Sequence, residues 1–289
     1  PDVISWHEWG NSGSEIPSNV LTVRAMVSNL GQHAAGRCSK ISINEMVPRE
    51  LNFNPGVHVS YFANLERAHI DSACHSCWPE PTIGEVCSAN HFGPGIGDNC
   101  GQWGPQCKGG LTLDGLLTCD GKEQPRSVWW AYKAYSAVQG QLKTVYGSDQ
   151  ADGVAATSNE GTATVAIGML TSQNTTLHLH LQNLPSEMLA GQTANVSIAS
   201  IKNSGVAALV VPHVENRQVA IVQNGTFTVP LNTTEGAAIF LAIGDSSRDV
   251  VQEFVRIPHL AEAKTDDDVA TILPRPAITW VSDPVRDGE

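Results

Sequence analysis

The stretch Ile41–Met46 reads ISINEM and ends an apolar run on a polar pair, Asn44 and Glu45. The alternation of apolar and polar residues before this pair predicts a half-buried β-strand. A strand can simply stop at polar residues, which would leave Glu45 solvated. Alternatively the acid marks a site, because parallel barrels carry their catalytic groups at the carboxyl ends of their strands. The neighbouring segments decide between these two interpretations.

Alternating strand and helix patterns surround this stretch on both sides. The strands end on polar or aromatic residues, and apolar residues recur at helical spacing between them. We expect strands over residues 2–9 and 40–45, helices over 19–30, 57–71 and 126–142, and a short segment that ends at Trp78. A repeated order of strand and helix is typical of βα units around a parallel sheet.

After about residue 147 the pattern changes to short, alternating runs that are rich in β-branched residues. Turn residues separate several of these runs, which read TATVAIGML, TTLHLHLQNL, ANVSIASI, QVAIVQ, GTFTVPL and AAIFLAIG. This pattern predicts an antiparallel β-sandwich over residues 147–250. The tail over residues 251–289 contains Asp266–Asp268 and several prolines, and we expect an irregular extension there.

The composition excludes several classes of protein. The chain has 289 residues, 41% of them hydrophobic and 16% charged, which fits a globular protein with a sizeable core. Its formal net charge is −12 and it has no basic patch, so we expect no nucleic-acid partner. No apolar run approaches the roughly 20 residues that a membrane-spanning helix needs, so we expect no membrane partner.

The cysteines are concentrated in one part of the chain. Five of the seven fall close together, at Cys74, Cys77, Cys87, Cys100 and Cys107. The last three of these lie in a Gly- and Pro-rich segment over residues 79–108. This segment has too few apolar residues for a core, so we expect disulfides to order it. Zinc is the competing interpretation of Cys74-x-x-Cys77, but no second CxxC or HxxxH follows at finger spacing, and we expect no metal.

Four N-x-S/T sequons lie in the second half of the chain, at Asn174, Asn195, Asn224 and Asn232. One sequon alone is weak evidence, because the pattern arises often by chance. Four sequons beside clustered cysteines favour a secreted, disulfide-bonded glycoprotein. We expect all four asparagines to face solvent on the sandwich and at least one of them to carry a glycan.

The expected strand order brings polar groups to one rim of the parallel sheet. His7 and Glu8 end the first strand, Glu45 ends the second, and Trp78 ends the third. A carboxylate can attack an anomeric carbon while a second carboxylic acid protonates the leaving oxygen. A Trp face offers an apolar platform for the C–H face of a sugar ring. The constellation therefore indicates chemistry on a carbohydrate.

The order of motifs resembles the C-terminal half of family 39 glycoside hydrolases, the clan A family of β-xylosidases and α-L-iduronidases. The motifs are SWHEWG, a helix with TVRAMVSNL, ISINEM, a helix that ends in HID, a Trp, and GGLTLDGLLTCDGKEQPRSVWWAYKAY. The resemblance covers about residues 2–140, and a trailing β-sandwich is also usual in this family. It implies the C-terminal part of a (β/α)8 TIM barrel followed by an antiparallel β-sandwich.

The resemblance also implies roles for individual residues. Glu45 would be the nucleophile, His7 would contact the nucleophile or a sugar hydroxyl, and Trp78 would form the floor of the −1 subsite. Asn44 and Glu8 are further candidates for contact with substrate. The acid/base Glu of this clan ends the fourth barrel strand, three βα units before the nucleophile, so Glu8 does not fit that role.

By this resemblance, residues 1–146 would supply about strands 6–8 of the barrel. The earlier βα units, with the acid/base Glu, would come from the same precursor or from another chain. The Cys-rich segment after Trp78 would lie on the rim of the site and could narrow or cover it.

We therefore expect a secreted retaining glycosidase that acts on β-xyloside-like glycans, with Glu45 as nucleophile and no cofactor. The alternative is a non-catalytic, extracellular structural or glycan-binding glycoprotein on the same fold. The residue at the end of the fourth strand would discriminate between the two, because only the enzyme needs a Glu there.

Overall fold

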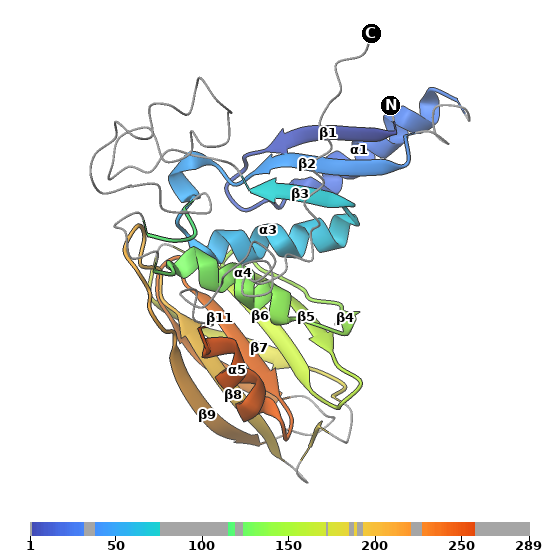
Figure 1. Ribbon diagram of the computed structural model, residues 1–289. Coiled ribbons are helices and arrows are strands. Elements are labelled where there is room, and N and C mark those ends of the chain that lie inside the picture. Colours follow the sequence, from blue (N-terminus) through green and yellow to red (C-terminus); the bar gives the residue numbers. More distant parts are fainter. Residues whose placement is uncertain are drawn as a thin grey trace, which may run out of the picture.

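The structure of the protein is a computed structural model (Figure 1). It describes residues 2–31, 38–75, 115–118, 124–171, 173–184, 188–189, 193–220 and 227–257. These residues form a mixed helix and sheet structure with several sheets. Within these ranges, no helix is both long and apolar enough to cross a membrane.

A three-stranded parallel sheet begins the chain. Its strands are β1 (Val3–Glu8), β2 (Lys40–Met46) and β3 (Ser72–His75), in that order across the sheet. Two helices, α1 (Ile16–Asn29) and α3 (Pro55–Ala68), connect the strands. Both helices pack on one face of the sheet, where Ile16, Val20 and Phe62 share a core with Ile41 and Ile43.

The helix ends follow from local chemistry. Helix α1 starts at Ile16, earlier than expected, because Pro17 sits in its first turn, where a missing N–H costs nothing. Ser18 therefore lies inside the helix, and its hydroxyl donates to the Glu15 carbonyl. Helix α3 starts after Asn54, whose side chain accepts a bond from the Val57 N–H at 3.1 Å. It ends at His69, which has a left-handed φ of 51°.

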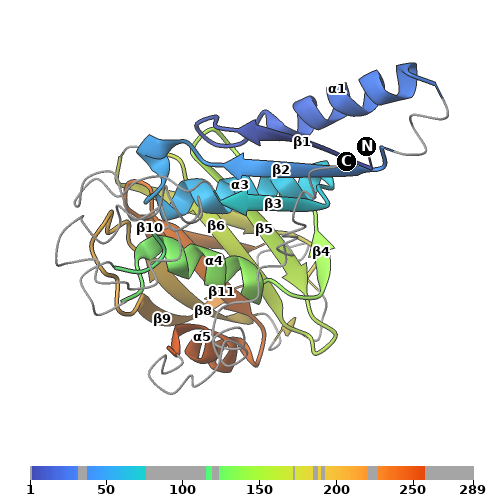
Figure 2. The ribbon, with the colours of Figure 1, turned by 45° about the horizontal axis from the view of Figure 1, so that its top comes forward.

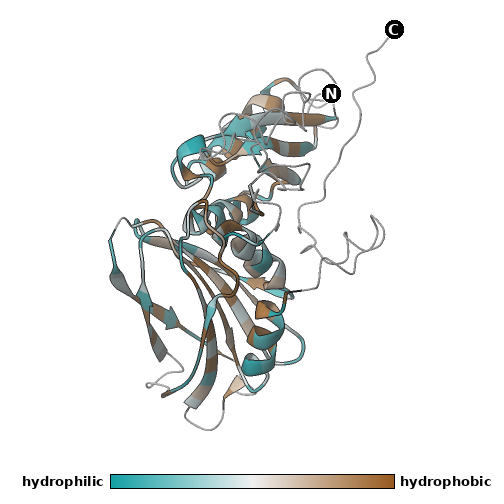
Figure 3. Ribbon diagram, turned by 60° about the vertical axis from the view of Figure 1, so that its left-hand side comes forward, coloured by the Kyte–Doolittle hydropathy of each residue, from teal (hydrophilic) through white to brown (hydrophobic). Residues whose placement is uncertain are grey.

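The second half forms a six-stranded antiparallel sheet in the order β4-β5-β6-β11-β8-β9. Hydrophobic residues run along its central strands (Figure 3), and every residue of β6 and β11 is buried. The strands are β4 (Gln141–Lys143), β5 (Ala151–Thr157), β6 (Ala163–Met169), β8 (Thr193–Ile201), β9 (His213–Ala220) and β11 (Ala238–Ile243).

A separate two-stranded antiparallel sheet covers one face of the six-stranded sheet. It consists of β7 (Thr175–Leu181) and β10 (Phe227–Thr233). On β7, the leucines Leu177, Leu179 and Leu181 turn toward the larger sheet, while the residues between them are exposed. A shared apolar core therefore fills the space between the two sheets.

Helices cover the opposite face of the six-stranded sheet. These are α3, α4 (Ser127–Ala137) and α5 (Ser247–Val255), and Figure 2 shows α3 between the parallel sheet and the six-stranded sheet. Trp130 of α4 and Phe254 of α5 pack with Phe240 of β11 in this layer. A short 3-10 turn, η1 (Arg49–Leu51), precedes α3.

Helix α3 contacts the six-stranded sheet without intervening side chains at one point. A Cβ built on Gly168 of β6 would lie 1.9 Å from the Gly56 carbonyl oxygen, and one on Gly56 would lie 2.3 Å from the Met169 oxygen. Only glycine fits at both positions. At the other end of α3, the Arg67 guanidinium pairs with the Asp152 carboxylate of β5. Helix α3 is thus shared by both halves of the chain.

Four further elements differ from the sequence prediction. The antiparallel part begins with β4 at Gln141, before the expected boundary at 147, and β5 was not expected at all. Helix α4 ends at Ala137, although helix was expected as far as residue 142. Helix α5 runs to Val255, whereas irregular chain was expected from residue 251.

Candidate active site

The first two strands bring His7 and Glu45 together at the carboxyl ends of β1 and β2. The two residues are paired in the parallel register, and His7 Nδ1 lies 3.8 Å from Glu45 Oε2. Their side chains are 43% and 30% exposed, so both can reach a ligand in solvent. The pair lies on the face of the sheet that α1 and α3 leave uncovered.

A β-bulge places Glu45 on this uncovered face. Strict alternation would turn Glu45 to the same side as Ile41 and Ile43, which are buried against the helices. The register instead runs from Trp6 opposite Ile43 to His7 opposite Glu45, so β2 contains one extra residue, Asn44. Bulges re-aim side chains in this way and are over-represented beside active sites.

The backbone is strained just after Glu45. Val47 is buried and has a φ of 73°, a conformation that a β-branched residue rarely adopts. Its N–H donates to the Glu8 carbonyl at 3.2 Å, which fixes the end of β2 against the end of β1. Such strain costs about 1–3 kcal/mol and is found mainly at functional sites.

Asn44 lies on the same face as the His7–Glu45 pair. Its amide nitrogen donates to the Ser5 hydroxyl of β1 at 3.1 Å. On β3, the Ser72 hydroxyl donates to the Ser42 hydroxyl of β2 at 2.8 Å. The uncovered face is therefore polar across all three strands, unlike the apolar face beneath the helices.

Glu8, expected among the substrate-contacting residues, lies on the opposite face of the sheet. It is only 4% exposed and points toward α1. Its carboxylate accepts bonds from the Trp6 indole at 2.5 Å and from the Asn19 amide at 2.9 and 3.2 Å. Alternation along β1 explains the difference, because His7 and Glu8 are neighbours and must face opposite ways. Glu8 ties β1 to α1 instead of lining the site.

Trp9 borders the site, although no role there was expected for it. Its ring lies 5.0 Å from the His7 ring, centroid to centroid, with an interplanar angle of 51°. The residue is 45% exposed, an unusual state for an indole in a folded chain. The run of aromatic residues in SWHEWG was the available signal, but it did not separate packing residues from ligand-facing ones.

Cys74 lies on strand β3 and is half-buried. Burial raises the pKa of its thiol, and the nearby Glu45 carboxylate raises that pKa further. Cys74 forms no disulfide with any residue in the described part of the chain. Trp78, Cys77, Cys87, Cys100 and Cys107, with the rest of the Cys-rich segment, lie outside the described residues.

The sequons differ in their surroundings. Asn174 and Asn232 are exposed near the β7–β10 sheet, and Asn232 accepts a bond from the Thr176 hydroxyl at 3.3 Å. Asn195 is only partly exposed and lies on β8, in the middle of the six-stranded sheet. Asn224 lies outside the described residues.

Comparison with known proteins gives the fold. No family model matches the chain, and no curated protein matches it in sequence. Among solved structures, N2152 from Neocallimastix frontalis gives a TM-score of 0.62 at 21% identity, over 84% of this chain and 53% of that one. A glucosidase from Croceicoccus marinus gives 0.51 at 12% identity, over 85% of this chain and 54% of that one.

Other solved structures that match include glycoside hydrolases of families 39, 30, 44 and 51. A GH39 enzyme from Xanthomonas axonopodis pv. citri gives a TM-score of 0.47 at 12% identity, over 79% of this chain and 48% of that one. Identities this low show the fold alone. The chain therefore shares its fold with part of N2152 and of the glucosidase, and it spans about half the length of each.

Proposed function

We propose that this chain is the C-terminal part of a secreted, retaining glycoside hydrolase of the family 39 type. In this proposal β1, β2 and β3 are about the sixth to eighth strands of a TIM barrel, and the antiparallel sheets form the trailing sandwich. The observation that carries the proposal is the His7–Glu45 pair, which a bulge turns onto the uncovered face at the carboxyl ends of parallel strands.

Glu45 is the nucleophile in this mechanism. Its carboxylate attacks the anomeric carbon, the bond from that carbon to the glycosidic oxygen breaks, and the leaving oxygen takes a proton from a second carboxylic acid. Water then attacks the glycosyl ester, gives its proton to the second carboxylate, and releases Glu45. His7 supports the first step, because an imidazole 3.8 Å away can orient the carboxylate or bind a sugar hydroxyl.

The aromatic residues supply the platform for the sugar. Trp9 is exposed and lies against His7, so its ring borders the space in front of Glu45. Apolar C–H groups of a pyranose pack well on such a ring. Trp78, from outside the described residues, keeps its proposed place at the −1 subsite, and Asn44 is placed to donate a hydrogen bond to a sugar hydroxyl.

The second carboxylic acid comes from the N-terminal part of the barrel. Glu8 does not supply it, because this carboxylate is buried on the helix side and bound by Trp6 and Asn19. The proposal therefore needs five further βα units, from the same precursor or from a second chain. It also needs an acid about 5–5.5 Å from Glu45, the spacing of retaining enzymes.

Activity of the full-length protein on aryl β-xylosides and related aryl glycosides tests the proposal. Glu45→Gln should lower kcat by about 10⁴-fold or more, the scale of loss when a covalent nucleophile is removed. Glu50→Gln, which removes an exposed carboxylate from η1, is the matched control and should leave kcat unchanged. A fluoro-sugar inhibitor should label Glu45.

The alternative function is that of a non-catalytic glycan-binding protein on the same fold. Among the described residues, Glu45 is the carboxylate beside His7, and a single carboxylate cannot perform the double displacement, which favours this alternative. In that case the full-length protein hydrolyses no glycoside, and the fourth strand lacks its Glu. Binding of an oligosaccharide that Trp9→Ala weakens would then support the alternative.

A further inference from the structure

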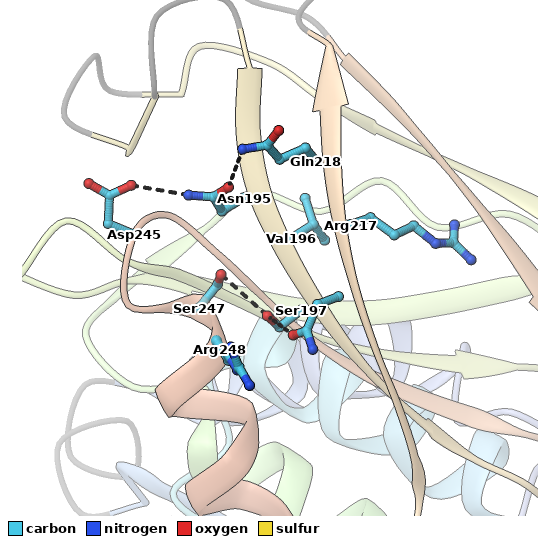
Figure 4. A pocket seen from close by; sticks show the side chains of 9 residues that line it. Asn195, Val196, Ser197, Arg217, Gln218, Asp245, Ser247 and Arg248 are labelled. Carbon is cyan, nitrogen blue, oxygen red and sulfur yellow. Dashed lines mark hydrogen bonds between the residues drawn. The ribbon is translucent and has the colours of Figure 1, made fainter.

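A polar cavity lies on the helix-covered side of the six-stranded sheet, far along the chain from the candidate active site. Its volume is about 370 Å³, within the range of about 300–1,000 Å³ that small-molecule sites occupy. It opens between β8, β9 and the start of α5 (Figure 4), and its walls are formed by Asn195, Val196, Ser197, Asn216, Arg217, Gln218, Asp245, Ser247 and Arg248.

Hydroxyl and amide groups form the floor and one wall of this cavity. Ser197 and Ser247 are 2% and 1% exposed; the Ser197 hydroxyl donates to Asn216 Oδ1 at 2.7 Å and lies 3.4 Å from the Ser247 hydroxyl. Arg217 points away from the cavity, because Glu215 and the Pro230 carbonyl bind its guanidinium. The lining thus combines hydroxyl and amide groups with the charged Asp245 and Arg248, and all of these groups can bind the hydroxyls of a sugar.

One wall of the cavity is itself a sequon, Asn195-Val196-Ser197. Strand β8 is paired on both sides, with β11 and with β9, so Asn195 has no free strand edge beside it. A group attached to Asn195 can leave the sheet only on the side of its own side chain. Helix α5 covers that side from Ser247 onward, and the cavity is the space that remains in front of it.

We propose that Asn195 carries an N-linked glycan and that the first N-acetylglucosamine of this glycan occupies the cavity. The glycan comes from a lipid-pyrophosphate-linked oligosaccharide of the secretory pathway. The bond from the sugar C1 to the pyrophosphate breaks, the bond from Asn195 Nδ2 to C1 forms, and one amide proton is lost. The proposal does not need glycosidase activity, but it rests on the secretion that the proposed function includes.

The existing contacts of Asn195 are compatible with the attachment. Its Nδ2 donates to Asp245 Oδ1 at 3.3 Å, and its Oδ1 accepts from Gln218 Nε2 at 3.3 Å. Glycosylation removes only one of the two amide hydrogens, so the other can keep the bond to Asp245, and the carbonyl oxygen can keep the bond to Gln218. The two bonds then fix the sugar against the serine-lined floor.

Glycopeptide mapping of the full-length protein, secreted from a eukaryotic host, tests the proposal. We expect a glycan at Asn195. We also expect an endoglycosidase that cuts between the first two sugars to act at least about ten-fold more slowly at Asn195 in the native protein than in the unfolded one. The exposed Asn174 and Asn232 serve as internal references, since glycans there should be cut at similar rates in both states.

Three variants separate attachment from folding. Asn195→Gln and Ser197→Ala should both remove the glycan, while Ser197→Thr should keep it, because threonine preserves both the sequon and the hydroxyl. An unoccupied Asn195 overturns the proposal. A glycan at Asn195 that is cut as fast in the native protein as in the unfolded one also overturns it, because that glycan would not occupy the cavity.

Discussion

His58, in the first turn of α3, is a fully buried imidazole among other rings. Its centroid lies 4.9 Å from that of His75 and 5.5 Å from that of Tyr132. Its Nε2 lies 2.9 Å from the Asn52 carbonyl oxygen, which can only accept, so Nε2 carries the proton. Burial lowers the pKa of His58 to about 4, since the surroundings disfavour the charged form.

This burial predicts a pH-dependent stability. Between about pH 6.5 and pH 4 the unfolded chain binds a proton at His58 and the folded chain does not, so the free energy of unfolding falls as pH falls. Over that window the group should remove about 3 kcal/mol. His58→Gln keeps an N–H donor but does not titrate, and should lack this part of the slope. Urea unfolding at pH 7 and pH 4 measures the loss of unfolding free energy in the wild type and in His58→Gln. An equal loss in the two proteins would contradict the prediction.

The two neighbouring carboxylates of the site region should respond differently to substitution. Glu8→Gln keeps an oxygen that accepts from Trp6 and Asn19, so it should leave kcat unchanged, in contrast to Glu45→Gln. Glu8→Ala leaves both part-buried donors without this partner and should lower the free energy of unfolding by about 1–2 kcal/mol. Denaturant unfolding measures the second effect. If Glu8→Gln lost its turnover, this result would show that Glu8 belongs to the active site after all.

The sequence predicted part of the site and could not predict the rest. The order of strands and helices correctly indicated that His7 and Glu45 end neighbouring strands. It did not indicate the bulge at Asn44, because the extra residue is defined only by pairing with β1. Nor did it indicate that Trp9 is exposed, since exposure depends on packing between distant segments.

At the scale of elements, the contact between Gly56 of α3 and Gly168 of β6 allows no side chain. Gly168→Ala or Gly56→Ala would push helix and sheet apart and should lower the free energy of unfolding by about 1–3 kcal/mol or more. Gly205→Ala is the matched control: it has open space but a φ of 56°, so it reports only the backbone cost. Thermal unfolding measures all three, and an equal loss at Gly205 would contradict the steric explanation.

The elements that were not predicted lack the usual signals. Strand β5 reads ADGVAAT and is made mainly of small residues, so it carries few of the β-branched side chains that mark a strand. Helix α5 is nine residues long, and its buried Val251 and Phe254 share a core cluster with Phe240 of β11. The local sequence of the helix does not reveal this contact. Packing on a completed sheet decides both elements.

At the scale of the whole molecule, α3 should make the two halves unfold together. Asp152→Asn removes the charge that pairs with Arg67 across the boundary and should lower the free energy of unfolding by about 1–3 kcal/mol, less at high salt because Arg67 is partly exposed. Urea transitions followed by tryptophan fluorescence and by far-UV circular dichroism should coincide in the wild type. Two separate transitions would show that α3 does not couple the halves.

The strand order of the six-stranded sheet also has a consequence for how the protein is made. Strand β11, the last strand among the described residues, lies between β6 and β8. Until Ala238–Ile243 leaves the ribosome, β6 and β8 each present an open edge that can pair with other chains. At roughly 5–20 residues per second, the stretch from Ile201 to Ile243 takes a few seconds to synthesise. During that interval the nascent chain is most exposed to aggregation and most dependent on chaperones.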